Sequence, residues 1–542
     1  MAAVRAAAIL ALLLAGPALA DGPRADWPEW KKKFWPEGDA WKGAEQVLTF
    51  VNGAEPETLD PHIMTGVPEH RLATALFEGL VTHHPETLEA VPGVAERWEI
   101  SPDGLTYTFH LRKDAKWSDG KWVNTADFVA SWQRALTPAT ACQYAYMLYP
   151  IAGAEAFNKG KGPWEQVGVV AKDPHTLVVK LGAPCAYFLD LCAFETLMPV
   201  RVDVIAAHGD RWSRAEHMVC NGPFKLAEWL PSQRITMLKN EHYWDRDFVK
   251  LEKVVALPYE DLETAFKLFQ QGQCDWNTAV PAAKIDELKR MPEYYATPYL
   301  GSYFYRINVT KPPMNDVRVR KALSLAVDRE VITRDILKAG QIPASWFCPK
   351  LPGYEPAKGL GFDREQARKL LAEAGYPGGK GFPELELLYN TNEAHKQVAE
   401  VVAQQWKEAL GITVSLRNTE WKVYLDDVQR LNYQIARAGW IGDYTDPNTF
   451  MDMFVTGGGN NQTGWSNARY DELIALAAKE VDRQKRAALL REAEQLLVEK
   501  ELPILPIYIY VNQGLLRDTV MGWHENVRDQ HPFQYIWMEP AE

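Results

Sequence analysis

Polar and aromatic residues follow three predicted strands in the second half of this 542-residue chain. They include a positive group at His395, a flat aromatic surface at Trp421 and a negative group at Asp443. The full set consists of Asn390, His395, Trp421, Gly439, Trp440 and Asp443. If the fold brings them together, they could bind a ligand that carries charges of both signs.

Three strands alternating with two helices must position these residues. The hydrophobic pattern predicts strands over 385–389, 412–416 and 433–438, separated by helices over 393–410 and 421–430. This β-α-β-α-β order predicts a parallel sheet with right-handed crossovers. Because ligands of such sheets bind beyond the carboxyl ends of the strands, we expect the residues that follow the strands to converge on one edge.

No standard catalytic motif accompanies them. The chain has no Gly-x-Ser-x-Gly turn, no His-Glu-x-x-His zinc pair and no P-loop lysine. Four histidines are close in sequence, but their spacing fits no standard metal site: His62, His70, His83 and His84. A hydrolytic carboxylate pair is still open, because no Asp or Glu stands out among many. We therefore expect neither a cofactor nor a catalytic residue, with a secreted hydrolase as the alternative from another class.

The first twenty residues have the layout of a secretory signal. Arg5 precedes an apolar run over 6–14, and the small residues of Ala18-Leu19-Ala20 end the segment. This pattern predicts cleavage after Ala20, whereas the alternative of an uncleaved anchor fits the Ala-x-Ala ending poorly. The apolar run is also too short to span a bilayer as a helix. We expect the mature protein in an exported compartment.

Composition limits the fold and the partners. About 520 residues remain after cleavage, more than one hydrophobic core usually serves, so we expect two or more lobes. The 47% of hydrophobic and 24% of charged residues are typical of a globular chain rather than a disordered one. The net charge of −12 becomes −13 when Arg5, the one charged residue among the first twenty, is removed. This balance argues against nucleic acid as a partner.

Six cysteines remain in the predicted mature chain, and none shows the C-x-x-C spacing of a zinc or thioredoxin-type site. An exported compartment permits up to three disulfides. Cys185 and Cys192 are close enough in sequence to pair, and reduced, buried thiols are the alternative.

Residues 27–42 carry four tryptophans among three consecutive lysines. Basic residues among aromatic ones can mark a surface that contacts a membrane or a partner. We favour the other interpretation, an extension packed on the body of the protein.

Several ordered blocks give the chain a family resemblance. They are Glu57-Thr58-Leu59-Asp60-Pro61-His62, Leu76-Phe77-Glu78-Gly79-Leu80, Pro92-Gly93-Val94-Ala95-Glu96-Arg97-Trp98, Thr108-Phe109-His110-Leu111-Arg112, Ala115-Lys116-Trp117-Ser118-Asp119-Gly120, Asp127-Phe128-Val129, Asn221-Gly222-Pro223-Phe224, Asn315-Asp316-Val317-Arg318-Val319-Arg320 and Ala436-Arg437-Ala438-Gly439-Trp440. With these blocks the chain resembles the periplasmic oligopeptide-binding proteins, within the large family of peptide and nickel receptors of ABC importers. The resemblance covers nearly the whole chain beyond the tryptophan-rich segment.

The resemblance implies a two-lobed α/β periplasmic binding protein with a ligand cleft between hinged lobes and an extra α/β domain. We expect the parts to be the signal peptide 1–20, lobe I at 21–77, 198–300 and 511–542, the extra domain II at 78–197, and lobe III at 301–510. It also implies a monomer in the periplasm that captures short peptides and delivers them to ABC permease subunits of the inner membrane, which a cytoplasmic ATPase drives.

Site residues follow from the same resemblance. Thr65-Gly66-Val67 and Ala438-Gly439-Trp440 match the segments that pair with the peptide main chain, and Asp443 matches the aspartate that receives the α-ammonium group. Arg437 and His395 match groups that meet the peptide carboxylate, while Tyr144 and Trp421 match aromatic residues of the cleft. Pairing with strands gives affinity that does not depend on side chains.

Two departures from the family pattern bear on specificity. A lysine that helps to hold some peptide carboxylates is replaced by Ser324, and a cysteine pair is replaced by Gly301 and Ile441. Loss of the lysine could change the preferred peptide length or mark a specialised receptor. Receptors of the same fold for murein peptides, or for a metal or haem complex, are therefore the alternatives.

Overall fold

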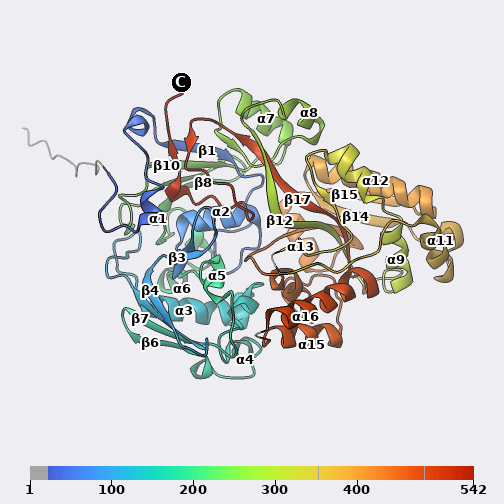
Figure 1. Ribbon diagram of the computed structural model, residues 1–542, viewed down its shortest axis with the longest axis horizontal. Helices are drawn as coiled ribbons and strands as arrows, with labels where there is room; N and C mark the ends of the chain where they lie inside the picture. Colours follow the sequence, from blue (N-terminus) through green and yellow to red (C-terminus); the bar gives the residue numbers. More distant parts are fainter. Residues whose placement is uncertain (1–21, 352, 481, 542) are drawn as a thin grey trace, which may run out of the picture.

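The computed structural model describes residues 22–351, 353–480 and 482–541 of the chain. The predicted signal peptide lies outside these residues. Figure 1 shows two halves joined across the middle of the molecule by long strands. Within the described ranges, no helix is both long enough and apolar enough to cross a bilayer.

One large sheet runs through both halves. Ten of its strands follow in the order β15-β14-β16-β12-β17-β11-β1-β10-β9-β8, and β13 pairs with β17. Their bounds are β1 Val47–Val51, β8 Phe224–Leu230, β9 Arg234–Lys239, β10 Lys253–Leu257, β11 Trp276–Asn277, β12 Tyr294–Ile307, β13 Ile342–Pro343, β14 Leu385–Asn390, β15 Val414–Thr419, β16 Ile435–Ile441 and β17 Ile504–Leu516.

The predicted β-α-β-α-β unit is confirmed. Strand β14 pairs in parallel with both β15 and β16, and the connecting helices are α12 (Glu393–Leu410) and α13 (Trp421–Gln429). The predicted end of the third strand was wrong by three residues. Because β16 extends to Ile441 along its partner β12, Gly439 and Trp440 lie within the strand rather than in the loop after it.

Two long strands connect the halves. Strand β12 pairs with β17 in two stretches, and the register shifts between Pro298 and Ser302. In Figure 1 both strands pass through the centre of the molecule. They are the part of the sheet whose geometry decides how the two halves face each other.

A smaller antiparallel sheet lies below α2 (Val67–Leu76) in Figure 1. Its order is β4-β5-β7-β6, with bounds β4 Ala95–Ile100, β5 Thr106–Leu111, β6 Val169–Asp173 and β7 Thr176–Lys180. Strand β5 alternates half-buried and buried residues, and β6 and β7 form an antiparallel hairpin. Helix α3 (Thr125–Leu136) packs on this sheet and is capped by Asn124, because Asn124 and Asp127 form a reciprocal capping box.

The remaining elements are two short two-stranded sheets and the other helices. The short strands are β2 Val81–His83, β3 Ala90–Pro92, β18 Val520–Met521 and β19 Trp537–Met538. The other helices are α1 Glu29–Lys32, α4 Ala154–Asn158, α5 Phe188–Leu191, α6 Val202–His208, α7 Leu262–Gln270, α8 Ile285–Leu288, α9 Val317–Leu325, α10 Arg329–Val331, α11 Arg364–Glu373, α14 Asn448–Met451, α15 Ala468–Ala477 and α16 Arg483–Gln495.

Several separate hydrophobic cores support the expectation of more than one lobe. One cluster lies around α2 and β8–β10, a second around α9, α11 and α12, and the largest joins the small sheet to α15 and α16. This last cluster packs the 78–197 region against the C-terminal half rather than leaving it as an isolated module.

The tryptophan-rich segment packs on the body, as we favoured. Trp27, Trp35 and Phe34 are buried against Phe248 and Tyr535. Two lysines, Lys31 of the segment and Lys250 of the body, take part in this packing. Lys31 is buried and paired with Asp245, and the Lys250 ammonium lies 3.2 Å from the centre of the Trp35 ring. Such cation–π contacts hold the segment to the protein rather than offer it to a membrane.

All six cysteines are unbridged, and five of them are buried. Of the two states that the sequence left open for Cys185 and Cys192, the structure has the reduced one. Burial raises the pKa of the Cys185 thiol to about 12, so the thiolate is a minor form at neutral pH.

Candidate functional site

A cavity of about 350 Å³ lies between the two halves of the molecule. Its size is within the range of small-molecule and cofactor sites. Nine of the ten predicted site residues line it: Thr65, Gly66, Val67, Tyr144, Trp421, Arg437, Gly439, Trp440 and Asp443. They come from regions hundreds of residues apart in the sequence, which the fold brings to one place.

An open strand edge forms one wall of the cavity. Strand β14 pairs with β16 only at Leu387↔Ile435 and Leu388↔Ala436. Residues 437–441 of β16 are therefore paired with β12 on one side and have no strand partner on the other among the residues that the structure describes. A strand edge of this kind can accept the main chain of an extended ligand.

Asp443 gives the cavity a negative end. Its Oδ2 accepts a hydrogen bond from the Thr449 hydroxyl at 3.1 Å, and Arg528 donates to its backbone carbonyl. Burial, and then the nearby Glu195 carboxylate, raise the pKa of Asp443 well above its ordinary value. A cation placed here would relieve both effects, because it would pair with a carboxylate that is poorly solvated.

Arg437 gives the opposite charge. Its guanidinium donates to Asn390 Oδ1 at 3.2 Å and to the Tyr510 hydroxyl at 2.5 Å, and it lies 5.0 Å from the centre of the Tyr303 ring. Its Nε has no hydrogen-bond partner. No carboxylate in the described part of the chain forms an ion pair with it, so a ligand carboxylate could supply the missing counter-charge.

His395 lies behind the cavity wall rather than in it. Its ring stands 5.5 Å from that of Tyr303, on the same ring system that supports Arg437. Burial, and then the charge of Arg437, hold the pKa of His395 well below its ordinary value, so the imidazole is neutral at pH 7. The positive charge at this end is that of Arg437, and a contact of His395 with a ligand carboxylate stays a prediction.

Trp421 closes the cavity from the C-terminal half. Its indole N–H donates to Glu69 Oε1 at 3.3 Å, a contact that joins α13 to α2 across the two halves. A Cβ at Gly66 would stand 3.0 Å from the Trp421 ring and 2.1 Å from Glu69 Oε2. Glycine at position 66 therefore leaves room for this interlobe contact.

Aromatic rings form another wall. Tyr144 stacks on Trp440, with ring centroids 6.0 Å apart, and also contacts Phe194 at 5.0 Å. The wall thus combines residues of the 78–197 region with strand β16.

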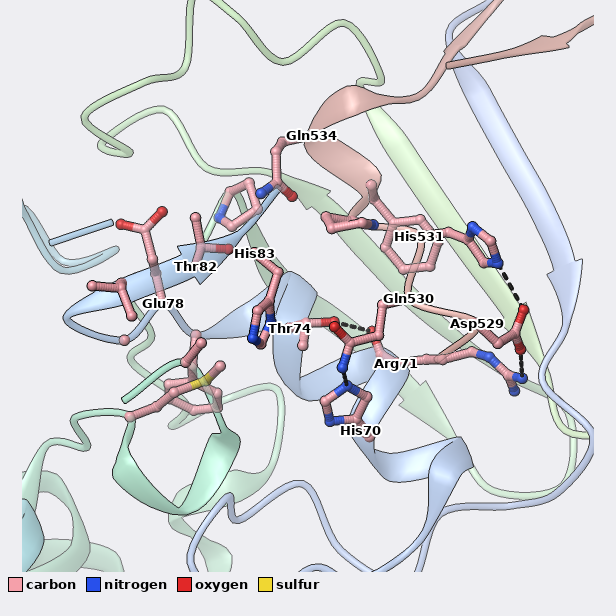
Figure 2. Close-up of a pocket in the computed structure, with 18 of the residues that line it drawn as sticks. His70, Arg71, Thr74, Glu78, Thr82, His83, Asp529, Gln530, His531 and Gln534 are labelled. Atoms are coloured by element: carbon pink, nitrogen blue, oxygen red, sulfur yellow. Dashed lines mark hydrogen bonds and ion pairs between the residues drawn. The ribbon is translucent and has the colours of Figure 1, made fainter. Parts of the chain in front are cut away.

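Sequence reasoning missed the contribution of the C-terminal segment. Arg71 on α2 donates to Asp529 Oδ2 at 2.9 Å, and His531 contacts Oδ1 of the same carboxylate at 2.7 Å. His70 meets Gln530 at 3.1 Å. Figure 2 shows these side chains around a second, smaller cavity of about 30 Å³, which has room for about one or two water molecules.

Comparisons with known proteins identify a family for the chain. The family model described as bacterial extracellular solute-binding proteins, family 5 Middle, matches residues 89–462. The periplasmic oligopeptide-binding protein OppA of Salmonella typhimurium is 40% identical over 495 residues, which cover 88% of this chain and 90% of that protein. The structure of Haemophilus influenzae OppA in complex with RPPGFSPFR matches with a TM-score of 0.87 and 36% identity, covering 92% and 99% of the two chains.

A third relative matches in two forms. The structure of the Escherichia coli murein tripeptide binding protein MppA matches with a TM-score of 0.88 at 35% identity, covering 92% of this chain and 99% of that one. Its unliganded open form matches with a TM-score of 0.62 at the same identity, covering 92% and 98%. The two halves of this chain are therefore arranged unlike those of the open form.

Proposed function

The chain belongs to family 5 of the bacterial extracellular solute-binding proteins, and from this premise we propose that it captures short oligopeptides in the cavity between its halves for an ABC importer. The observation that carries the proposal is the order of groups along one wall. A half-buried carboxylate at Asp443 and the Arg437 guanidinium, which pairs with no carboxylate of the described residues, stand at the two ends of an open strand edge.

A peptide matches each of these features. Its α-ammonium group would pair with Asp443, its main chain would pair with residues 437–441, and its carboxylate would pair with Arg437. Thr65, Gly66 and Val67 would face it from the other half. Because these contacts go to the main chain and the termini, we expect a broad preference for side chains.

Capture requires a hinge. The place for it is the crossing of β12 and β17, where the register shifts between Pro298 and Ser302, close to the expected lobe boundaries at 300/301 and 510/511. Closure would form the Trp421–Glu69 contact and remove water from the peptide, and the closed form would then dock on the permease subunits. Ligand binding must favour the closed form for this cycle to work.

The remaining parts of the proposal concern the state of the protein. It acts as a monomer in the periplasm, after cleavage of the signal following Ala20, and it releases its peptide without breaking a bond. The large coverage of the oligopeptide-binding relatives supports a receptor over a hydrolase.

Isothermal titration of the purified protein with alanine peptides of two to nine residues tests this function. We expect binding to free peptides, and a loss of at least about tenfold on N-acetylation, since the ammonium group is then absent. Absence of binding at every length would refute the proposal. Broad preference would be refuted if one peptide bound more than about a hundredfold better than its scrambled relatives of equal length.

The alternative function, a secreted hydrolase, is tested by mass analysis of the peptides after incubation with the protein. Cleavage products would favour a hydrolase. A rise in melting temperature with metal ions, and none with peptides, would favour a receptor for a metal complex.

A further inference from the structure

A second arginine, Arg306, lines the same cavity and is not explained by the peptide contacts above. It lies on β12 with 7% of its surface exposed. Its one hydrogen bond among the described residues is a long one, from Nη2 to the backbone carbonyl of Asn460 at 3.5 Å. Its Nε is buried without a partner, and no ion pair involves it in the ranges that the structure describes.

Two other buried arginines of the chain show how unusual this state is. Arg320 donates three bonds of 2.5 to 2.8 Å to the carbonyls of Met314 and Glu501. Arg329 donates to Pro506 O at 2.8 Å and to the Ser324 hydroxyl at 3.0 Å, besides two longer bonds. The guanidinium groups of Arg320 and Arg329 are thus well satisfied by their own chain, whereas that of Arg306, which lines the cavity, has one long hydrogen bond among the described residues.

Arg306 and Arg437 approach the cavity from opposite faces of the sheet. In the pairing of β12 with β16, Arg306 stands opposite Ala436 and Tyr305 stands opposite Arg437. Paired residues share a face and successive residues alternate, so the two arginine side chains leave opposite faces. Their ring contacts agree, since Arg437 lies over Tyr303 whereas Arg306 lies toward Phe304. One carboxylate cannot neutralise both groups from opposite faces.

We propose that Arg306 binds a second carboxylate of the ligand, so that the preferred ligands are peptides with an acidic side chain in addition to their C-terminal carboxylate. The inference rests on the proposed function, and narrows it at one side-chain position. Consecutive side chains of an extended peptide paired with residues 437–441 also point to alternate faces, so one of them enters the Arg306 side of the cavity. An acidic side chain there would form a charge-assisted hydrogen bond with a desolvated guanidinium.

Titration calorimetry with tripeptides tests this. Trialanine is compared with variants that carry Glu, Gln or Lys at each position in turn. In the wild-type protein we expect one position at which Glu binds at least about tenfold more tightly than Gln, and Lys more weakly than Gln. Equal affinity for Glu and Gln at every position would overturn the inference without any variant. If another length binds more tightly in the first titration, the series is made at that length, and absence of binding at every length would instead refute the peptide function itself.

Variants assign the preference to this residue. R306Q should abolish the difference between Glu and Gln, and R306E should make the Lys peptide the tighter ligand, which a merely structural role would not do. R334Q is the matched control, because Arg334 is exposed and paired with Asp335 outside the cavity. Persistence of the Glu preference in R306Q would overturn the assignment. C-terminally amidated peptides then show whether Arg306 or Arg437 holds the side-chain carboxylate. If Arg306 holds it, the preference for Glu over Gln persists after amidation in the wild type and is absent in R306Q.

Discussion

Glu69 is expected to make peptide binding depend on pH through the closed form. The side chain is fully buried, and burial raises the pKa of its carboxyl to about 7 from 4.5. Part of this burial comes from Trp421, which belongs to the other half and contacts Glu69 only when the halves are together. A hinge that opens the cavity would return Glu69 to water and its pKa toward the ordinary value.

The sign and size of this pH dependence follow from the linkage between closure and proton binding by Glu69. A raised pKa means that the closed form binds the proton more tightly than the open form does. Below pH about 4.5 both forms are protonated and closure carries no cost, and the cost of closure grows as the pH rises toward 7. Above pH 7 it is constant and amounts to at most about 3 kcal/mol, the value for a pKa that falls from about 7 back to 4.5 on opening. Closure, and with it peptide affinity, therefore weakens from pH 4.5 to pH 8.

The variant E69Q removes this effect. Glutamine keeps an oxygen that can accept from the Glu57 N–H at 2.8 Å and from Trp421, but it cannot ionise. We expect the ratio of the wild-type Kd to the E69Q Kd for one peptide to be near one at pH 4.5. By pH 8 it should rise to as much as about a hundredfold. Because the same peptide is used with both proteins, ionisation of its own termini cancels in the ratio.

E29Q serves as the control, since Glu29 is 87% exposed on the surface. A ratio that stays the same between pH 4.5 and pH 8 would refute the reasoning, because Glu69 would then be equally buried in the open and closed forms or ionised in both.

Three further predictions concern Asp443 in the cavity, the buried pair of Lys31 with Asp245, and the cysteines. D443N should weaken the binding of free peptides by at least about tenfold and leave N-acetylated peptides unaffected, as calorimetry would show; equal losses for both would contradict pairing with the ammonium group. K31M should lower the free energy of unfolding by about 3 kcal/mol or more, because it leaves the buried Asp245 carboxylate unpaired. Denaturant unfolding should show the loss, the double variant K31M/D245N should recover part of it, and a stability equal to that of the wild type would contradict the burial of a charged pair. Finally, alkylation of the unfolded, unreduced protein should label six cysteines; labelling of four or fewer would reveal a disulfide.

Local sequence patterns were sufficient for much of the framework. The periodic 393–410 segment identified α12 with both of its ends. The end of β16 was missed because Gly439 is a weak strand former, and only the pairing of residues 435–441 with β12 keeps the strand extended there.

Site residues that lie close together in the sequence could be predicted, whereas contacts between distant segments could not. Arg437 and Asp443 both lie within the short segment 436–443, where each matches a residue of the family pattern. The contacts of Arg71 with Asp529 and of Trp421 with Glu69 join residues about 460 and 350 positions apart, and no local pattern marks such pairs. The neutral state of His395 likewise depends on burial behind Tyr303, which composition and spacing do not reveal.

Peptide capture can be tested by native mass spectrometry of the protein purified from an exported fraction, followed by release of any bound ligand. We expect a complex of one chain with one ligand, and released ligands that are short peptides, enriched in acidic residues relative to the mixture from which they were drawn. A protein that has only its own mass, both as purified and after exposure to a peptide mixture, would contradict peptide capture. Release of a metal or haem complex in place of peptides would contradict it equally.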